Sequence, residues 1–412
     1  MALAQAVAVA VPFFFIVVAS SSSAAPADSL FGCYDSIVSF GDSLSDTGNG
    51  LLPELHQGPC LACNPPNGRT YFHRPTGRFS DGRIVIDFIA QSLGLPLLQP
   101  YFPEAYEDAA QRRRTFSAGV NFAVAGASVL SYEFYDKIFG YQNPYTTVSL
   151  GTQMEWFRTF LAGFPDGRKY LERSLIILGP IGGNDYNHLF MQERSLNELR
   201  SLVPIVVSKI GSTIQAFCSQ TRLVIGAYQI NMILIMMMMM MQELIELGVI
   251  TILVPGNLPF GCLPSYLTQY ENDYDPQIGC LSWLNQFSRY HNDLLQKELQ
   301  RIRKLHPHVN IMYGDYYNDA MRMYLSPNQF GFGNQILRSC CGIGGRYNYN
   351  ESARCGTPEA TCCDVPSEYI NWDGIHFTEA ANSLMTQGLL QGSYTDPLFS
   401  TICLSSTSIA NY

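Results

Sequence analysis

Two segments near opposite ends of the 412-residue chain carry the residue types that nucleophilic catalysis requires. The first is Gly41-Asp42-Ser43-Leu44, and the second is Asp373-Gly374-Ile375-His376. A serine hydroxyl becomes a strong nucleophile when an imidazole takes its proton, and a carboxylate can fix the tautomer of that imidazole. Because Asp373 and His376 stand three positions apart, both side chains can come from one loop. Ser43 is therefore a candidate nucleophile, His376 its base, and Asp373 the residue that orients the base.

Two other segments could supply hydrogen-bond donors to the same site. Gly126 follows an apolar stretch and lets a backbone N–H approach a ligand closely. Asn184 follows two glycines and presents a side-chain amide. Taken alone, each segment has a simpler interpretation. Ser43 could cap a helix, His376 could be a loop histidine capped by the neighbouring Asp373, and the glycine and the asparagine could form turns. Together, the four segments meet each requirement of a serine hydrolase once.

The elements that would position these residues follow from the hydrophobic pattern. Apolar runs predict strands at 36–40, 120–124, 174–178, 249–254 and 309–313. Helical periodicity predicts helices at 84–93, 152–161, 196–215, 284–305 and 378–390, the first of them capped by Ser80-Asp81. Alternation of strands with helices predicts an α/β protein with a parallel sheet covered on both faces. Ligands of such sheets bind outside the carboxyl ends of the strands, and we expect the four segments in loops after predicted strands.

Composition and the amino terminus limit the class of protein. Apolar residues make up 47% of the chain, charged residues 14%, and the net charge is −9, which argues against a disordered protein and a nucleic-acid binder. Residues 1–25 are uncharged, with an apolar block followed by small residues, and predict a cleaved secretory signal peptide rather than a membrane anchor. We expect one domain over 31–403.

The cysteines agree with secretion. Twelve cysteines in a secreted chain predict disulfides, although their pairing does not follow from sequence. Cys60 and Cys63 have the spacing of half a zinc site, but an oxidising compartment favours a bridge, and we expect no metal. Asn350 begins the one Asn-x-Ser/Thr sequon of the chain and is a predicted glycosylation site.

Residues 216–242 do not fit this pattern. They include six consecutive methionines, and the uncharged part at 223–242 is long enough to cross a bilayer. The preceding helix offers another explanation, because its apolar stripe passes through Ile210 and Ile214 and is then interrupted. If 216–242 is removed, Leu244 falls three positions after Ile214 and continues the stripe. We therefore interpret 216–242 as an insertion, such as a translated in-frame intron.

The four segments, in this order, resemble the GDSL esterase/lipase family of SGNH hydrolases in its plant secreted form. The resemblance runs from Ile37 to Leu389 apart from 216–242, and it includes the stretches 72–83 and 254–262. It implies a three-layer α/β/α sandwich with a central parallel sheet, the flavodoxin-like SGNH hydrolase fold. By this resemblance, Ser43 is the nucleophile, His376 is its base, and Asp373 orients the base. The oxyanion hole would be formed by the backbone N–H groups of Ser43 and Gly126 and by the side chain of Asn184.

The resemblance implies a function as well. We expect a secreted, extracellular glycoprotein of the cell wall or apoplast that hydrolyses carboxylic esters through an acyl-enzyme, with no cofactor. Expected substrates are acyl lipids, or acetyl and phenolic esters of small metabolites; no nucleic-acid partner is expected, nor stable membrane insertion unless 223–242 is a real segment. Two alternatives remain open: an acyltransferase that uses the same serine, and a non-catalytic or misfolded product caused by 216–242.

Overall fold

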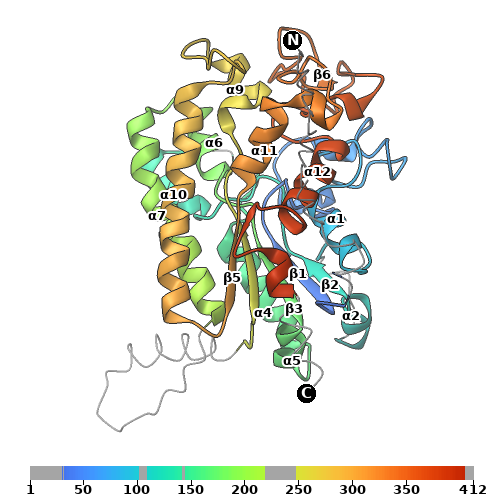
Figure 1. Cartoon of the computed structure of the whole chain (residues 1–412), viewed down its shortest axis with the longest axis vertical. Helices are drawn as coiled ribbons and strands as arrows, with labels where there is room; N and C mark the ends of the chain where they lie inside the picture. The colour runs from blue at the N-terminus through green and yellow to red at the C-terminus, as the bar shows by residue number, and fades with distance from the viewer. Residues whose placement is uncertain (1–29, 31, 102–108, 142–143, 219–246, 404–412) are drawn as a thin grey trace, which may run out of the picture.

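The computed structural model describes residues 30, 32–101, 109–141, 144–218 and 247–403 (Figure 1). The predicted signal peptide and all but the first three residues of the 216–242 segment lie outside the described residues. Within the described residues one six-stranded sheet forms the centre of the molecule, with helices on both of its faces.

The central sheet has the strand order β2-β1-β3-β4-β5-β8. Its strands are β1 (Ser36–Phe40), β2 (Gly119–Asn121), β3 (Ser174–Leu178), β4 (Thr251–Pro255), β5 (Asn310–Gly314) and β8 (Thr395–Asp396). The first five strands are parallel, and β8 pairs antiparallel with β5 at one edge. Every residue of β1, β3 and β4 is buried, as expected for strands covered on both faces. The order 2-1-3-4-5 is that of flavodoxin-like sheets, so the predicted fold class is confirmed.

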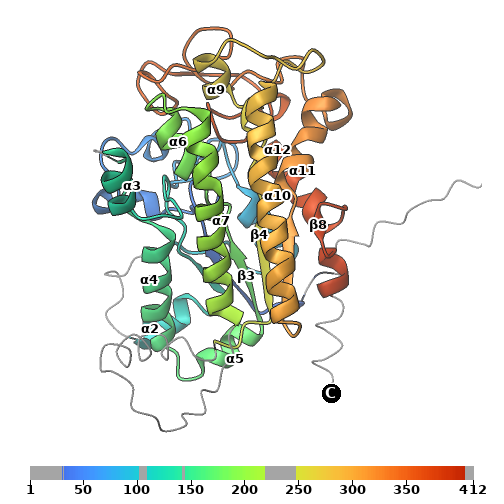
Figure 2. The ribbon, with the colours of Figure 1, turned by 90° about the vertical axis from the view of Figure 1, so that its left-hand side faces the viewer.

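Helices form the two outer layers of the sandwich. In Figure 2, α4 (Leu150–Ala162), α7 (Leu196–Cys218) and α10 (Ser282–Leu305) lie in a row over one face of the sheet. In Figure 1, α1 (Val85–Ser92) and α12 (Glu379–Leu390), which contact each other, lie on the opposite side. These five helices fall where the hydrophobic periodicity predicts them, with ends that differ by at most three residues.

Several shorter elements were not predicted. They are the helices α2 (Ala109–Thr115), α3 (Tyr132–Phe139), α5 (Gly167–Glu172), α6 (Asn184–Phe190), α9 (Pro264–Gln269) and α11 (Tyr316–Leu325), the short strands β6 (Cys341–Gly342) and β7 (Thr361–Cys362), and the edge strand β8. Six short 3-10 turns complete the description: Asn49–Leu51, Pro53–Leu55, Leu61–Cys63, Phe260–Cys262, Pro327–Phe330 and Pro366–Glu368.

The prediction that Ser80-Asp81 caps α1 is wrong. The side chain of Asp81 does not begin α1; its Oδ1 accepts the backbone N–H of Glu379 at 2.7 Å, at the first turn of α12. The first turn of α1 is closed instead by Asp87, whose carboxylate accepts the N–H of Ile84 at 3.0 Å. Asp81 therefore joins two distant parts of the chain, and α12 follows directly after the candidate base His376.

Ten of the twelve cysteines form disulfides. The pairs are Cys33–Cys403, Cys60–Cys63, Cys262–Cys280, Cys340–Cys363 and Cys341–Cys355. The remaining two, Cys218 and Cys362, are free thiols. Since Cys60 and Cys63 are bonded to each other, they do not form half of a zinc site.

Of the helices in the described ranges, α7 alone has the length and hydropathy of a membrane span. More than half of its most apolar window is buried inside the domain, which is usual for a core helix of a soluble protein. Phe217, near its end, is 1% exposed, with its ring centroid 5.5 Å from that of Phe40 in β1. The segment 223–242, considered above as a possible span, lies outside the described residues.

Candidate active site

The candidate nucleophile lies in a turn directly after β1. The amide side chain of Gln153 fixes the start of this turn, since it donates to the carbonyl of Gly41 at 2.8 Å and accepts its N–H at 3.0 Å. The carbonyl of Asp42 then accepts the N–H groups of Ser45 and Asp46, both at 3.0 Å. Ser43 therefore lies in one tight turn, half-buried, and not at the start of the helix that an N-cap would require.

A chain of hydrogen bonds joins Ser43 to the loop before α12. His376 Nε2 lies 2.7 Å from Ser43 Oγ, and His376 Nδ1 lies 2.8 and 2.9 Å from the two carboxylate oxygens of Asp373. The nucleophile and the base are 333 residues apart in the sequence. The structure thus brings together the three residues that the sequence nominates, with distances suitable for proton transfer from a serine to an imidazole.

The loop that carries Asp373 and His376 is closed by its own hydrogen bonds. Asp373 Oδ1 accepts the backbone N–H groups of Ile375 and His376, both at 2.8 Å, and the N–H of Trp372 donates to the carbonyl of His376 at 2.8 Å. Trp372 is fully buried and its indole N–H donates to Asn67 Oδ1 at 2.9 Å. This anchor holds the loop in place, so the positions of the carboxylate and the imidazole do not depend on surface contacts.

Two carboxyl groups flank the Ser43–His376 pair, and their pKa values shift in opposite directions. Burial acts to raise the pKa of Asp373, but the charge of His376, its hydrogen bond and two backbone N–H groups together lower this pKa below the ordinary range. Burial raises the pKa of Asp42 to about 7, against the opposing effects of the Leu44 N–H and the His376 charge. Asp373 is therefore the carboxylate that can stabilise a protonated His376.

Gly126 and Asn184, the two candidate donors, belong to neighbouring segments. Asn184 begins α6, and its amide Nδ2 donates to the carbonyl of Ala127 at 3.0 Å, which ties α6 to the turn that contains Gly126. Gly126 has a φ of 82°, and a Cβ at this position would lie 2.6 Å from the ring of Tyr145. The turn therefore requires glycine. Because an amide carries two N–H groups, Asn184 keeps one for another acceptor.

Two buried carboxylates fix the Gly126 turn on both sides. Asp46 is fully buried and accepts four backbone N–H groups, three from its own turn and one from Ala125 at 2.8 Å. Asp185, next to Asn184, accepts the N–H groups of Val129 and Leu130 at 2.8 and 3.0 Å. Neither role was predicted, although Asp46 follows Ser43 closely and Asp185 directly follows Asn184.

Phe79 is a further neighbour of the base, and its role was not predicted. Its ring stacks on the imidazole of His376, with 4.6 Å between the ring centroids. Phe79 belongs to the 72–83 stretch that supports the family resemblance, which was the available signal.

Ser43 and Asn184 line one narrow cleft of about 30 Å³. Its other lining residues are Asp42, Leu44, Pro180, Gly183, Asn187, Asn257, Leu258, Phe260, Leu263 and Ile375. Two of these, Asn187 and Ile375, also line a larger neighbouring cavity of about 350 Å³. Gly126 is not part of either lining. The narrow cleft at Ser43 therefore adjoins a larger cavity.

The arrangement of the described side chains does not indicate a metal site. Within the described ranges, the group of side chains close enough to share a metal ion is Cys340, Cys362 and Cys363. Cys340 and Cys363 are joined as a disulfide and so do not offer thiolate ligands.

Asn350, the predicted glycosylation site, is exposed.

An α/β sandwich that holds a hydrogen-bonded Ser–His–Asp group at the carboxyl end of its sheet has the geometry of a serine hydrolase. Residues 37–389 match the family described as GDSL-like Lipase/Acylhydrolase. Among similar proteins, a GDSL esterase/lipase of Arabidopsis thaliana is 45% identical over 381 residues, which cover 90% of this chain and 88% of the relative. The sinapine esterase of Brassica napus is 43% identical over 387 residues, which cover 92% and 90%. The chain belongs to the GDSL lipase/acylhydrolase family and is a carboxylic ester hydrolase.

Proposed function

We propose that the protein is a secreted serine esterase that hydrolyses small carboxylic esters through an acyl-enzyme on Ser43. The observation that carries this proposal is the 2.7 Å contact between Ser43 Oγ and His376 Nε2, with Asp373 on the other ring nitrogen. In the first half-reaction Ser43 attacks the ester carbonyl, His376 takes the hydroxyl proton, and His376 then gives it to the departing alcohol. In the second half-reaction His376 activates a water that releases the acid.

The developing oxyanion would be met by three N–H donors. They are the backbone N–H groups of Ser43 and Gly126 and the free N–H of the Asn184 amide. Asp46 and Asp185 support this role, because they hold the Gly126 turn against the nucleophile turn and against α6. Preorganised donors of this kind contribute about 10²–10³ in turnover each.

The 350 Å³ cavity would bind the bulkier side of the ester. Its lining combines apolar and aromatic side chains, among them Met191, Tyr266 and Tyr349, with a polar rim that includes the ion pair of Glu351 and Arg354 at 3.6 Å. A cavity of this size accommodates an aromatic ring or a short chain better than a long acyl chain. We therefore favour phenolic and acetyl esters of small metabolites over acyl lipids, and the sinapine esterase relative supports the inclusion of sinapine among test substrates.

Secretion is supported by the five disulfides, which persist in oxidising compartments, and by the signal-like residues 1–25. The extracellular wall space is the proposed location. We propose a glycan at Asn350, which is exposed and precedes the cavity-lining Glu351. Digestion of the secreted protein with a peptide N-glycosidase should lower its mass and convert Asn350 to Asp; an unchanged mass contradicts the assignment.

We also propose that 216–242 is an insertion into one continuous helix. Removal of these residues would place Leu244 at the position of Phe217, whose ring lies 5.6 Å from that of Phe157, so the buried site would stay apolar. The described flanks are the end of α7 and the start of β4. Both lie at the amino-terminal ends of the strands, away from the carboxyl ends that carry the site (Figure 1). A variant that lacks 216–242 should be secreted in higher yield and keep esterase activity; loss of folding would refute the insertion.

Labelling with a fluorophosphonate tests the nucleophile. The wild-type protein should be labelled at Ser43, and Ser43→Ala should abolish both labelling and hydrolysis of p-nitrophenyl acetate. Ser45→Ala, in the same turn, should still be labelled, because its hydroxyl only donates to the carbonyl of Gly179. Labelling of Ser43→Ala at the wild-type rate would refute the proposal. Products formed with an added alcohol acceptor separate hydrolysis from acyl transfer.

A further inference from the structure

The cleft beside Ser43 contains a polar group that neither the catalytic mechanism nor the fold uses. Asn257 follows β4, is only 4% exposed and lines the same cleft as Ser43 and Asn184. Its amide nitrogen Nδ2 is buried and has no hydrogen-bond partner among the described residues. A buried donor without a partner costs about 1–3 kcal/mol, and such groups are rare in folded proteins.

The side chain of Asn257 does not hold its own loop. Asn292 of α10 does so, because its Oδ1 accepts the backbone N–H of Asn257 at 2.7 Å and its Nδ2 donates to the backbone carbonyl of Asn257 at 3.0 Å. The N–H of Gly256 donates to the carbonyl of Gly314, which fixes the preceding residue. The loop is therefore positioned from the backbone, and the Asn257 amide is left for an occupant of the cleft.

The surroundings of the amide define the chemistry of that occupant. Next to Asn257 the cleft is lined by the apolar side chains Leu258, Phe260 and Leu263, and its lining contains no basic residue. An anionic group would lack a counter-charge there, whereas a neutral oxygen acceptor would satisfy the orphan donor. We propose that Asn257 is a specificity-determining residue whose amide binds a neutral oxygen, such as an ether, hydroxyl or carbonyl oxygen, in the ester group that occupies this cleft. This inference rests on the proposed esterase function.

Isosteric ester pairs test this donor. One pair, p-nitrophenyl methoxyacetate and p-nitrophenyl butyrate, differs by an oxygen on the acyl side; another, 2-methoxyethyl and butyl acetate, differs on the alcohol side. Asn257→Ala and Asn257→Asp should each lower the kcat/KM ratio of oxygen-bearing to plain ester by about 2–10-fold in at least one pair, the equivalent of one neutral hydrogen bond. Intrinsic ester reactivity cancels, because each ratio is compared with that of the wild type.

Controls separate this outcome from loss of folding and from failure of the mechanism. Asn334→Ala, at an exposed asparagine outside the cleft, should keep the wild-type ratios. Both Asn257 variants should still be labelled by fluorophosphonate at Ser43, which reports an intact nucleophile. Unchanged ratios in both pairs, with labelling intact, would overturn the role of Asn257 alone; activity that survives Ser43→Ala would overturn the esterase mechanism instead.

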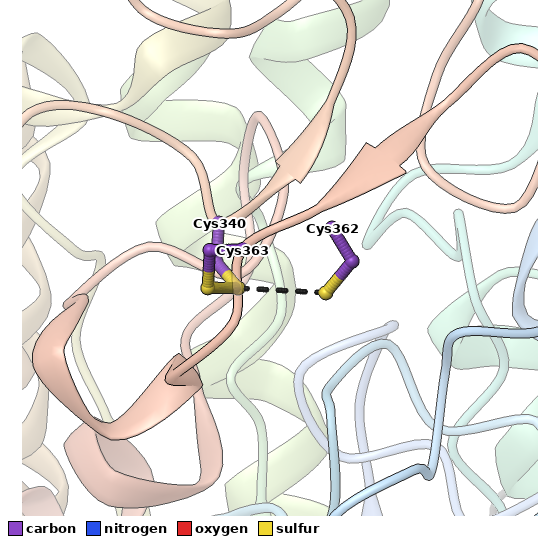
Figure 3. Close-up of side chains that lie close together, drawn as sticks. All are labelled: Cys340, Cys362 and Cys363. Carbon is purple, nitrogen blue, oxygen red and sulfur yellow. Dashed lines mark hydrogen bonds between the residues drawn. A yellow bond between two sulfur atoms is a disulfide. The ribbon is translucent and has the colours of Figure 1, made fainter.

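A separate observation concerns the free thiol of Cys362. Its Sγ lies 3.6 Å from Cys340 Sγ, which is bonded to Cys363. In Figure 3 the dashed line marks this contact between Cys362 Sγ and Cys340 Sγ, beside the Cys340–Cys363 disulfide. Arg69 Nη1 approaches Cys362 Sγ at 3.0 Å, where its positive charge favours a thiolate. The three Sγ atoms lie within 4.8 Å of one another, so Cys362 Sγ stands to the side of the Cys340–Cys363 bond. A rotation of the Cys362 side chain that brings its Sγ into line with that bond would allow exchange.

We propose that these three cysteines exchange their disulfide within the chain. The Cys362 thiolate attacks Cys340 Sγ, a Cys340–Cys362 bond forms, the Cys340–Cys363 bond breaks, and Cys363 leaves as a thiolate that takes up the proton. The reaction needs no external oxidant. Burial raises the pKa of the Cys362 thiol, and the hydrogen bond and charge of Arg69 oppose this rise. The charges of Asp81 and Asp364 raise the pKa further. Because the thiolate is the attacking species, exchange should be faster at higher pH.

Alkylation and peptide mapping test the exchange. After incubation at pH 8.5 the wild-type protein should carry N-ethylmaleimide on Cys362 in some molecules and on Cys363 in others. Cys363→Ser should contain a Cys340–Cys362 bridge, whereas Cys362→Ser should keep Cys340–Cys363. Cys218→Ser, which removes the other free thiol, should leave the distribution unchanged. Label on Cys362 alone in the wild type, together with unbridged Cys340 in a folded Cys363→Ser, would overturn the proposal.

Discussion

Asp42 and Asp373 flank the same Ser43–His376 pair from two regions of the molecule, and they differ in what surrounds their carboxyl groups. The side chain of Asp42, in the nucleophile turn, accepts one backbone N–H, from Leu44 at 3.0 Å, and burial raises its pKa to about 7. Asp373, in the base loop, accepts two backbone N–H groups and the His376 imidazole, and its pKa is lowered despite burial. Donors and a nearby positive charge, and not residue type, therefore decide which carboxyl stays ionised.

The two regions also differ in how they are held. The nucleophile turn is attached to the sheet and to buried polar side chains such as Gln153 and Asp46. The base loop lies beside the cysteine-rich segment, where the N–H groups of Cys340 and Cys341 donate to the carbonyls of Asn371 and Trp372. One region is thus stabilised by hydrogen bonds to the core, and the other by the buried Trp372 and by hydrogen bonds to a segment that two disulfides constrain.

The largest expected effect is the loss of the ionised carboxylate. Asp373→Asn should lower kcat by on the order of 10⁴, because the imidazole loses both its orientation and the charge that stabilises its protonated form. Asp42→Asn, which replaces a carboxyl of raised pKa, should keep kcat within about tenfold. Hydrolysis of p-nitrophenyl acetate at pH 7.5 measures both. Equal losses in the two variants would remove the difference between the two carboxyls.

Removal of a bridge tests the second difference. Cys341→Ala with Cys355→Ala opens a loop with a sequence separation of 14 and should lower the free energy of unfolding by about 3 kcal/mol. Cys60→Ala with Cys63→Ala, which opens a separation of three residues, should cost less. Urea unfolding of both double variants provides the comparison. A larger loss in the Cys60 and Cys63 variant would show that the bridge beside the base loop does not stabilise the fold more than the shorter bridge.

The pH dependence of stability should change with Asp42. Because its folded pKa of about 7 lies above the ordinary value of 3.8, the folded chain binds this proton more tightly, so its contribution is present at low pH and is lost between about pH 4 and 7. The folded pKa of Asp373 is lowered, so this carboxylate contributes stability at pH values above its ordinary pKa of 3.8, and that contribution is lost as the pH falls through the folded pKa. Asp42→Asn should flatten the decline of the urea midpoint from pH 4.5 to pH 7.5. An unchanged slope, with Glu359→Gln as the control at an exposed carboxyl, would contradict the assignment.

The smallest expected effect concerns the ring that stacks on His376. Phe79→Leu should lower kcat by about 2–10-fold, the equivalent of one aromatic pair of roughly 0.5–1.5 kcal/mol. Phe72→Leu, whose ring contacts Tyr71 and Arg78, should leave kcat unchanged. Steady-state kinetics at one pH suffice. A loss as large as that of Asp373→Asn would mean that stacking, and not the carboxylate, orients the base.

Much of this fold follows from local sequence. The strands β1 and β3 were predicted to the residue, because each is a short, mainly apolar run that ends directly before a glycine. The edge strand β8 was not, since two residues carry no periodicity, and α6 was missed because Asn184 after two glycines favours a turn. Local pattern is informative where an element is long and buried, and it fails where tertiary contacts decide.

The same distinction applies to the site. Ser43, Asp373 and His376 could be nominated because their spacing and neighbours carry chemistry within a few residues. Asp46 could not be assigned a role, because its bond to Ala125 joins positions 79 residues apart. Asn257 was equally hidden, since its unpaired amide is recognised only when the atoms around it are placed.

The bridge between Cys33 and Cys403 spans 370 positions and turns nearly the whole domain into a covalent ring. A protease that cuts one exposed loop of this ring cannot separate the two fragments, which remain attached until the bridge is reduced. A single cut therefore leaves the nucleophile and the base, which lie near opposite ends of the chain, on one molecule.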